Sequence, residues 1–206
     1  KPIVNKKKIL KKFFKKFLTL KNKKFYLFLG RFHEKKGCEI IIESVKKLKD
    51  NFKNIILFAG PKTGSQYELE IEHLIKKYNL QKKIIVTNAL FGDLKWGAIQ
   101  ASRAMVLSSH GENFGISLVE SLCFGKPVIT TNKVNISSEI LKYKAGFVSK
   151  NRVKQFSYIL KKFNNLKNQE LKKLSKNAFN CFNKNFDISI KKNSLGNFIK
   201  KNIRSH

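Results

Sequence analysis

Short apolar runs alternate with amphipathic segments through the middle of the chain, and this alternation limits the possible folds more than any other feature of the sequence. The apolar runs are the expected strands, at Phe25–Gly30, Ile55–Ala59, Ile84–Thr87, Ala104–Ser108, Val128–Thr130 and Gly146–Val148. The expected helices are Lys36–Leu48, Tyr67–Tyr78, Asp93–Ala101 with Asp93 as its cap, a segment from the Ser108–Gly115 loop to Phe124, and Ser137–Lys142. Such alternation builds βαβ units. We therefore predict an α/β fold with a Rossmann-like parallel sheet of about six strands and helices on both faces.

The two ends of the chain have a different pattern, without strand signals. Residues 1–24 hold eleven lysines and no acidic residue, with apolar side chains at helical spacing from Ile9 to Leu18. This segment could be a helix on a membrane surface or a short helix packed on the domain at a hinge. Residues 151–206 are typical of two or three basic helices. We therefore divide the chain into a basic linker helix at 1–24, a Rossmann-like domain at 25–150 and a helical extension at 151–206.

The net charge of +31 raises the question of nucleic-acid binding, but the distribution of charge argues against it. The excess positive charge lies mainly in the two flanking segments. Specific base readout favours arginine, but in this chain lysine greatly outnumbers arginine. Nucleic acid is therefore an unlikely partner, and an anionic membrane surface is the better candidate. The three cysteines are far apart in apolar stretches, which indicates buried thiols in a reducing compartment.

Residues 108–130, with the sequence SSHGENFGISLVESLCFGKPVIT, combine a glycine-containing loop with the start of a helix. The first turn of a helix presents unpaired N–H groups and partial positive charge, so it forms an anion site. Glu112 and Glu120 flank this site with seven residues between them. Carboxylates beside an anion site make sense as acceptors for sugar hydroxyls, in bonds of about 1.5–3 kcal/mol. The alternative is that Glu112 is an acid near the N-cap that the helix dipole favours, and that Glu120 is a solvated helix residue.

Gly30 and Arg31 end the first strand, and Lys36 and Gly37 precede the first helix. Arginine is rare in this chain, and its planar fork suits a pyrophosphate, to which Lys36 would add a point charge. The alternative is that both are ordinary surface cations. Ligands of parallel sheets lie beyond the carboxyl ends of the strands. That rule places on one rim the residues Arg31, Pro61, Asn88, Ser109 and Thr131.

Three runs now carry a family resemblance: FLGRFHEKKGCEIIIES, GDLKWGAIQAS and SSHGENFGISLVESLCFGKPVIT. In this order and spacing they resemble the C-terminal, donor-binding domain of retaining GT-B glycosyltransferases of family four, formerly group 1. The resemblance covers about residues 25–150. It implies a hexosyltransferase that moves a hexose from a nucleoside-diphosphate sugar to a glycan or lipid-linked acceptor, as in polysaccharide biosynthesis. The alternative is a non-catalytic nucleotide or sugar-nucleotide binding module with the same fold.

The resemblance also implies roles for the charged residues. Arg31 and Lys36 match the basic pair that neutralises the departing diphosphate. Glu112 matches the first acid of the paired-glutamate motif, which contacts the transferred sugar, so these three are the expected catalytic residues. Glu120 matches the second acid, which binds the ribose hydroxyls.

Further donor contacts are implied at backbone positions. Gly30 belongs to the end of the first strand, and Glu139 falls where the family often has an acid of less certain role. The segment that cradles the base matches Asn88, Ala89 and Leu90. The amides that meet sugar hydroxyls and phosphate match Asn113, Phe114, Gly115 and Ile116.

The implied mechanism is transfer with retention at the anomeric carbon, by front-face attack and without a protein nucleophile. Cations and helix-end amides stabilise the charge that grows on the leaving diphosphate. No metal is required for this, and we expect no cofactor beyond the donor itself. His110 is a lone histidine beside the motif, and we interpret it as a hydrogen-bonding residue rather than as a metal ligand.

The family also has an N-terminal domain of similar size, which supplies most acceptor contacts and which residues 1–206 do not contain. We therefore expect the chain to be a fragment or one half of a split enzyme, which binds donor weakly and transfers little by itself. The expected location is cytoplasmic, with peripheral attachment to the inner membrane face.

Overall fold

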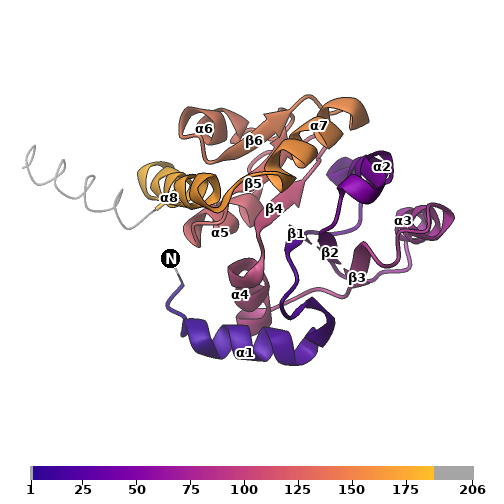
Figure 1. Cartoon of the computed structure of the whole chain (residues 1–206), viewed down its shortest axis with the longest axis horizontal. Coiled ribbons are helices and arrows are strands. Elements are labelled where there is room, and N and C mark those ends of the chain that lie inside the picture. The colour runs from indigo at the N-terminus through magenta and orange to yellow at the C-terminus, as the bar shows by residue number, and fades with distance from the viewer. Residues whose placement is uncertain (1, 188–206) are drawn as a thin grey trace, which may run out of the picture.

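A six-stranded parallel sheet forms the centre of the protein in a computed structural model, which describes residues 2–187 (Figure 1). The strands are β1 (Phe25–Leu29), β2 (Ile55–Ala59), β3 (Ile84–Thr87), β4 (Ala104–Leu107), β5 (Val128–Thr131) and β6 (Gly146–Ser149). Their order is β3-β2-β1-β4-β5-β6, and every pairing is parallel. This confirms the predicted α/β sheet. The predicted strand ends agree with the structure to within one residue.

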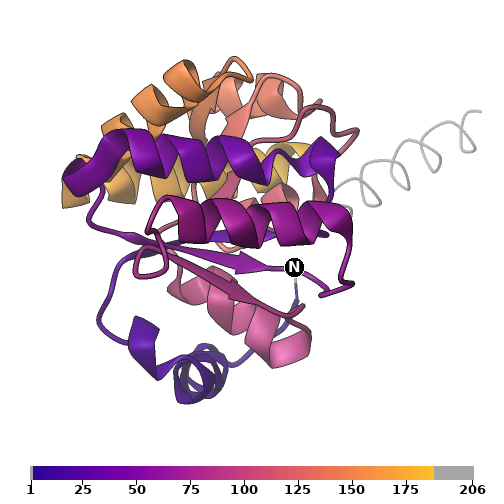
Figure 2. The same ribbon diagram turned by 90° about the vertical axis from the view of Figure 1, so that its right-hand side faces the viewer.

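Helices cover both faces of this sheet. They are α1 (Lys6–Lys16), α2 (Cys38–Leu48), α3 (Gln66–Lys77), α4 (Gly92–Ala101), α5 (Ile116–Cys123), α6 (Ser137–Lys142), α7 (Val153–Asn164) and α8 (Asn168–Asn185). Figure 2 shows α2 and α3 on one side of the strands and α1 and α4 on the other. On these faces α2 packs against α7, and α5 packs against α8. A third helix, which the sequence allowed beyond α8, would lie outside the described residues.

Two predicted helix starts are wrong. Lys36 does not open the first helix, because residues Glu34–Lys36 form a separate 3-10 turn and α2 begins at Cys38. Gly37 lies between them at φ 63°, a left-handed conformation that stops one element and starts the next. Asp93 is not a cap, because α4 already begins at Gly92 and Phe91 takes the cap position. Asp93 lies in the first turn, where a carboxylate still favours the dipole.

The sheet order places a switch point between β1 and β4. From this point the chain order runs outward in both directions, to β2 and β3 on one side and to β5 and β6 on the other. The loops that follow β1 and β4 therefore leave the sheet side by side at its carboxyl edge. In open parallel sheets this is where ligands bind. These two loops carry Arg31, Lys36 and Glu112, and Glu120 follows in α5.

Helix α1 packs on α4 and buries its apolar side chains there. Ile9 and Phe13 are buried, and the ring of Phe13 stacks on Phe25 with centroids 5.7 Å apart. Of the two alternatives for this segment, the structure therefore shows the packed helix. The lysines of α1 face solvent, so the attraction to an anionic membrane surface stays a prediction based on charge. Within residues 2–187 no helix combines the length and apolar composition needed to cross a bilayer.

Gly97 permits the close approach of α1 and α4. We therefore expect that replacing this helical glycine with alanine lowers the stability of the protein instead of raising it. A Cβ at Gly97 would lie 2.5 Å from the carbonyl oxygen of Ile9 and 2.7 Å from Cβ of Phe13. Glycine to alanine inside a helix ordinarily stabilises by about 1 kcal/mol. Here we expect Gly97→Ala to destabilise by about 1–2 kcal/mol, because overpacking pushes α1 away. Thermal unfolding measures this as a Tm lowered by about 2–8 °C.

A matched control removes a contact across the same helix pair without adding volume. Lys12→Ala deletes the exposed ion pair between Lys12 Nζ and Asp93 Oδ2, 3.4 Å apart. Exposed pairs contribute at most about 1 kcal/mol, so Tm should change little. A Gly97→Ala variant that is as stable as the natural chain, or more so, would show that α1 can move away at no cost.

Candidate functional site

A pocket of about 430 Å³ opens at the carboxyl edge of β1 and β4. Its size lies within the usual range for small-molecule sites. Arg31 and Lys36 reach it from the loop after β1, and Glu112 and Glu120 reach it from the loop after β4 and from α5. The two cations and two acids that the sequence singled out thus line one cavity.

Both acids of the pocket are already paired with a lysine. Lys36 Nζ donates a hydrogen bond to Glu112 Oε2, and these side chains keep only 23% and 19% of their surface exposed. Lys95 Nζ lies 2.7 Å from Glu120 Oε1 in a second, similarly sheltered pair. No ion pair joins Arg31 to a carboxylate in the described part of the chain. The pocket therefore has an excess of one positive charge, which suits an anionic ligand.

The N-terminus of α5 supplies further positive potential to the same pocket. Gly115 caps this helix, and Ile116 and Ser117 begin it, and all three line the cavity. Free amides in a first helical turn, together with the helix dipole, stabilise negative charge. The pocket thus combines cationic side chains with an electropositive helix end.

The other predicted donor-binding residues divide into two groups. Gly30, Ala89, Leu90, Gly115 and Ile116 line the pocket.

Asn88, Asn113 and Phe114 do not line it. Asn88 Oδ1 accepts from the amides of Lys62 and Ala89 and so holds the backbone. Asn113 and Phe114 border a neighbouring cavity of about 630 Å³, together with Glu139. The functional roles implied for all these residues stay predictions.

Lys95 is a pocket residue that the sequence reading missed. It lies in the first half of α4, and its ammonium group sits 4.0 Å from the ring centroid of Trp96 while it pairs with Glu120. Lysines are so common in this chain that composition could not single it out. The available signal was position, because α4 follows β3 and so begins on the same rim.

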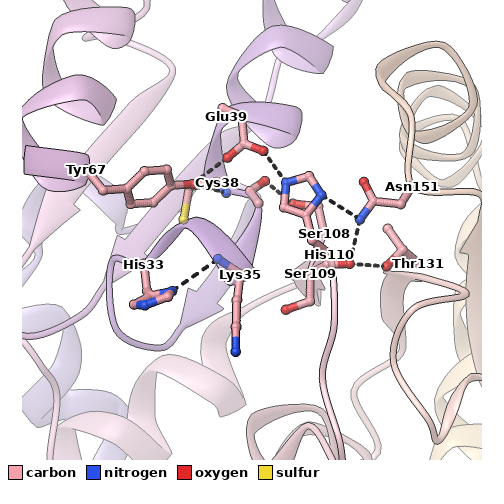
Figure 3. Close-up of polar contacts among 11 residues, drawn as sticks. His33, Lys35, Cys38, Glu39, Tyr67, Ser108, Ser109, His110, Thr131 and Asn151 are labelled. Atoms are coloured by element: carbon pink, nitrogen blue, oxygen red, sulfur yellow. Dashed lines mark hydrogen bonds and ion pairs between the residues drawn. The ribbon is translucent and has the colours of Figure 1, made fainter.

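A set of side-chain contacts, which we call the loop clamp, joins the segments around the pocket (Figure 3). The clamp consists of Gly37, Glu39, Ser108, His110 and Asn151. His110 Nε2 lies 2.6 Å from Glu39 Oε1, and His110 Nδ1 lies 3.1 Å from Asn151 Nδ2. The amide N–H of Asn151 donates, so His110 Nδ1 accepts this hydrogen bond. His110 Nε2 therefore carries the ring proton and donates a hydrogen bond to Glu39. Ser108 Oγ donates to the carbonyl of Gly37.

The clamp therefore fixes the loop with Lys36 relative to the loop with Glu112. It is tied in turn to the sheet, because Asn151 Nδ2 and Thr131 Oγ1 donate to the carbonyl of Ser109 at 2.8 and 2.7 Å. His110 is a hydrogen-bonding residue here, as expected. Among the described residues no group of three or more His, Cys, Asp or Glu side chains is arranged to hold a metal ion.

Tyr67 and Cys38 complete the support of Glu39. The Tyr67 hydroxyl donates to Glu39 Oε2 and accepts from the amide of Cys38 at 2.9 Å. Burial raises the pKa of both the Tyr67 phenol and the Cys38 thiol well above their usual range. Tyr67 thus remains a proton donor to Glu39, and Cys38 remains a thiol rather than a nucleophilic thiolate.

Comparison with known proteins shows similarity to several sugar transferases. The chain is 34% identical over 114 residues to the 2-deoxystreptamine N-acetyl-D-glucosaminyltransferase of Niallia circulans, covering 55% of this chain and 28% of that protein. It is 23% identical over 201 residues to an alpha-1,3/1,6-mannosyltransferase of Dictyostelium discoideum, covering 89% of this chain and 47% of that one. The chain therefore spans less than half the length of these relatives.

Solved structures share the fold at low sequence identity. A glycosyltransferase from Rickettsia africae matches with a TM-score of 0.81 and 20% identity, over 98% of this chain and 54% of that one. The Anabaena protein HepE, solved in complex with UDP and glucose, matches with a TM-score of 0.79 and 18% identity, over 96% of this chain and 53% of that one. Residues 11–180 match the family of glycosyl transferases group 1. The chain, with its GT-B-type sheet and the charged pocket at the switch point, belongs to this family of glycosyltransferases.

Proposed function

We propose that the chain is the donor-binding half of a retaining glycosyltransferase, which transfers a hexose from a nucleoside-diphosphate sugar to a glycan or lipid-linked acceptor. The observation that carries this proposal is the convergence of Arg31, Lys36, Glu112 and Glu120 on one pocket. A diphosphate needs cations and amides, and a sugar and a ribose need hydrogen-bond acceptors. The pocket offers both kinds of group within about 430 Å³.

In this proposal Arg31, Lys36 and the amides at the start of α5 stabilise the diphosphate as its bond to the anomeric carbon breaks. Glu112 accepts hydrogen bonds from the transferred hexose, and Glu120 accepts them from the ribose. The acceptor attacks from the face that the diphosphate leaves, so configuration is retained without a protein nucleophile. No step calls for a metal ion, and turnover requires a second domain that provides the acceptor contacts.

The relatives support the class of donor and acceptor. HepE is solved with UDP-glucose as well as with UDP. TarM of S. aureus is solved with UDP together with alpha-GlcNAc-glycerol. We propose a nucleotide sugar as donor for this chain on the same basis. A cytoplasmic location with peripheral membrane attachment, and the division at residues 24 and 150, remain parts of the proposal.

A thermal-shift panel of UDP-, GDP- and ADP-sugars tests the donor class, and Glu120→Ala tests the site. We expect one class of donor to raise Tm in the natural chain, and Glu120→Ala to weaken its binding by about 10- to 100-fold. The physical reason is the loss of a charged hydrogen bond of about 1.5–3 kcal/mol. The matched control Glu70→Ala removes an exposed acid on α3, outside the pocket, and should leave binding unchanged.

The 2′-deoxy form of the bound nucleotide sharpens this test. In the natural chain it should bind more weakly than the ribose form, and in Glu120→Ala the difference should disappear, because both changes remove the same contact. A panel without any binding ligand would refute the donor-binding proposal. Equal binding by Glu120→Ala would remove Glu120 from the site.

A further inference from the structure

The lining of the pocket has charged and uncharged parts. The charged part includes both ion pairs, Lys36–Glu112 and Lys95–Glu120. The uncharged part includes the segments after β2 and β3, with the residues Ala59, Gly60, Pro61, Ala89, Leu90 and Phe91. A ligand with a diphosphate beside the cations thus also has an apolar surface within the same pocket.

Phe91 is the unusual member of this uncharged part. It keeps 77% of its surface exposed, more than any other aromatic side chain among residues 2–187. Large aromatic side chains gain most of their stabilising effect from burial, which Phe91 forgoes in the free protein. An exposed ring on the lining of the pocket is therefore available to a ligand.

The position of Phe91 in the chain strengthens this point. Phe91 is the N-cap residue of α4, and no side chain caps this helix. Serine, threonine, aspartate and asparagine are favoured at N-caps because their oxygens accept the orphan amides, whereas phenylalanine has no such group. The choice of phenylalanine therefore does not serve the helix.

Hydrogen bonds hold the backbone of Phe91 and of the segments beside it, and the carbonyl of Phe91 accepts from the amides of Leu94 and Lys95. Glu68 is 4% exposed, and its Oε2 accepts from the amides of Thr63 and Gly64 at 2.8 and 2.9 Å, which fixes the loop after β2. Asn88 Oδ1 accepts from the amide of Ala89 at 2.7 Å and fixes the segment after β3. Pro61 and Leu90 lie next to these hydrogen-bonded segments and line the pocket.

We infer that Phe91 is the base-stacking residue of the nucleotide site: its ring covers one face of the nucleobase, while the apolar wall at Pro61 and Leu90 meets the base from within the pocket. This inference rests on the proposed function, because it concerns the nucleoside part of the same donor. A stacked aromatic ring binds any base through its π-face. Phe91 therefore contributes affinity for the nucleoside in general, and choice among bases falls to the backbone at residues 88–90.

Calorimetric titration of the chain with UDP, ADP and inorganic pyrophosphate tests the inference. Phe91→Ala should weaken the binding of UDP and of ADP by about 5- to 150-fold, the range for loss of one base–aromatic stack. It should leave the affinity for pyrophosphate unchanged, since pyrophosphate has no base. Phe91→Trp should retain nucleotide binding. The control Tyr158→Ala removes a 65% exposed ring on α7, outside the pocket, and should change none of the three.

Phe91→Ser separates a ligand role from a structural role. Serine can accept an orphan amide of α4, so Tm should equal or exceed that of the natural chain while nucleotide binding falls. A lowered Tm with unchanged UDP affinity would overturn the inference and assign Phe91 to the fold or to a protein partner. Equal UDP binding by Phe91→Ala would overturn the inference alone. A natural chain that binds neither UDP nor pyrophosphate would refute the proposed function as well.

Discussion

Replacing Lys36 with methionine should weaken UDP binding by about 100-fold or more, because two unfavourable effects act together. In the proposed binding mode the diphosphate loses a charge-assisted hydrogen bond from Lys36. In addition Glu112, which pairs with Lys36 in the free pocket, becomes an uncompensated negative charge beside the ligand. Methionine keeps the length and apolar stem of lysine, so the change removes mainly the charge. Isothermal titration at fixed ionic strength measures the effect.

Lys35→Met is the matched control for this variant. Lys35 is the adjacent residue and is exposed, and it does not line the pocket. It changes the net charge equally, so a similar loss of affinity would indicate a general electrostatic effect rather than a contact with the diphosphate.

Glu112→Gln completes a double-mutant cycle with Lys36→Met. It releases Lys36 from its ion pair, so UDP should bind about 3- to 30-fold more tightly, as expected for the release of a partly buried pair. Glycosyl transfer by the whole enzyme should fall by contrast, because in the proposed mechanism Glu112 is the carboxylate that contacts the hexose. If the two changes are strictly additive, Lys36 and Glu112 do not interact in solution.

Gly37→Ala should destabilise the protein by about 3–5 kcal/mol, a large loss for a single added methyl group, because left-handed strain and steric overlap act together. A Cβ at Gly37 would lie 2.3 Å from the carbonyl oxygen of Ser108. Backbone atoms of a sheet-edge loop cannot move aside as a flexible side chain can. The loops after β1 and β4 must therefore separate, which also disrupts the loop clamp and the binding of UDP.

Gly64→Ala isolates the conformational part of this effect. Gly64 has φ 69°, close to the 63° of Gly37, but no atom lies within 4 Å of the added Cβ. Gly64→Ala should therefore destabilise the protein by only about 1–2 kcal/mol, the strain of a left-handed alanine. Urea unfolding of both variants then gives the contribution of the overlap by difference. Equal losses for the two variants would show that the contact between Gly37 and Ser108 adjusts freely.

The strands of the sheet could be predicted from the sequence because central parallel strands are buried on both faces and appear as continuous apolar runs. β2 at Ile55–Ala59 is buried at every position, and its predicted limits agree with the structure. The start of α4 was harder to predict. A local rule favours Asp93 as cap, but Gly92 adopts φ 51° and the helix begins earlier.

The site was predictable where a residue type carries its chemistry locally, as with Arg31 and the two glutamates. Pairings between distant segments were not predictable. Lys95 and Glu120 are 25 residues apart in the chain and meet only because α4 and α5 adjoin the same edge. Likewise nothing near Glu39 in the sequence indicates that His110 is its partner, 71 residues away.

The distance along the chain between the two halves of the clamp also has a consequence for the route by which the protein folds. Gly37 and Ser108, like Glu39 and His110, are separated by 71 residues, and β1 gains its neighbour β4 only after β2 and β3 have been made. Closing so long a loop is entropically costly and tends to occur late. A ligand that needs both halves recognises only the finished molecule, so it slows the first step of unfolding and leaves the rate of folding unchanged.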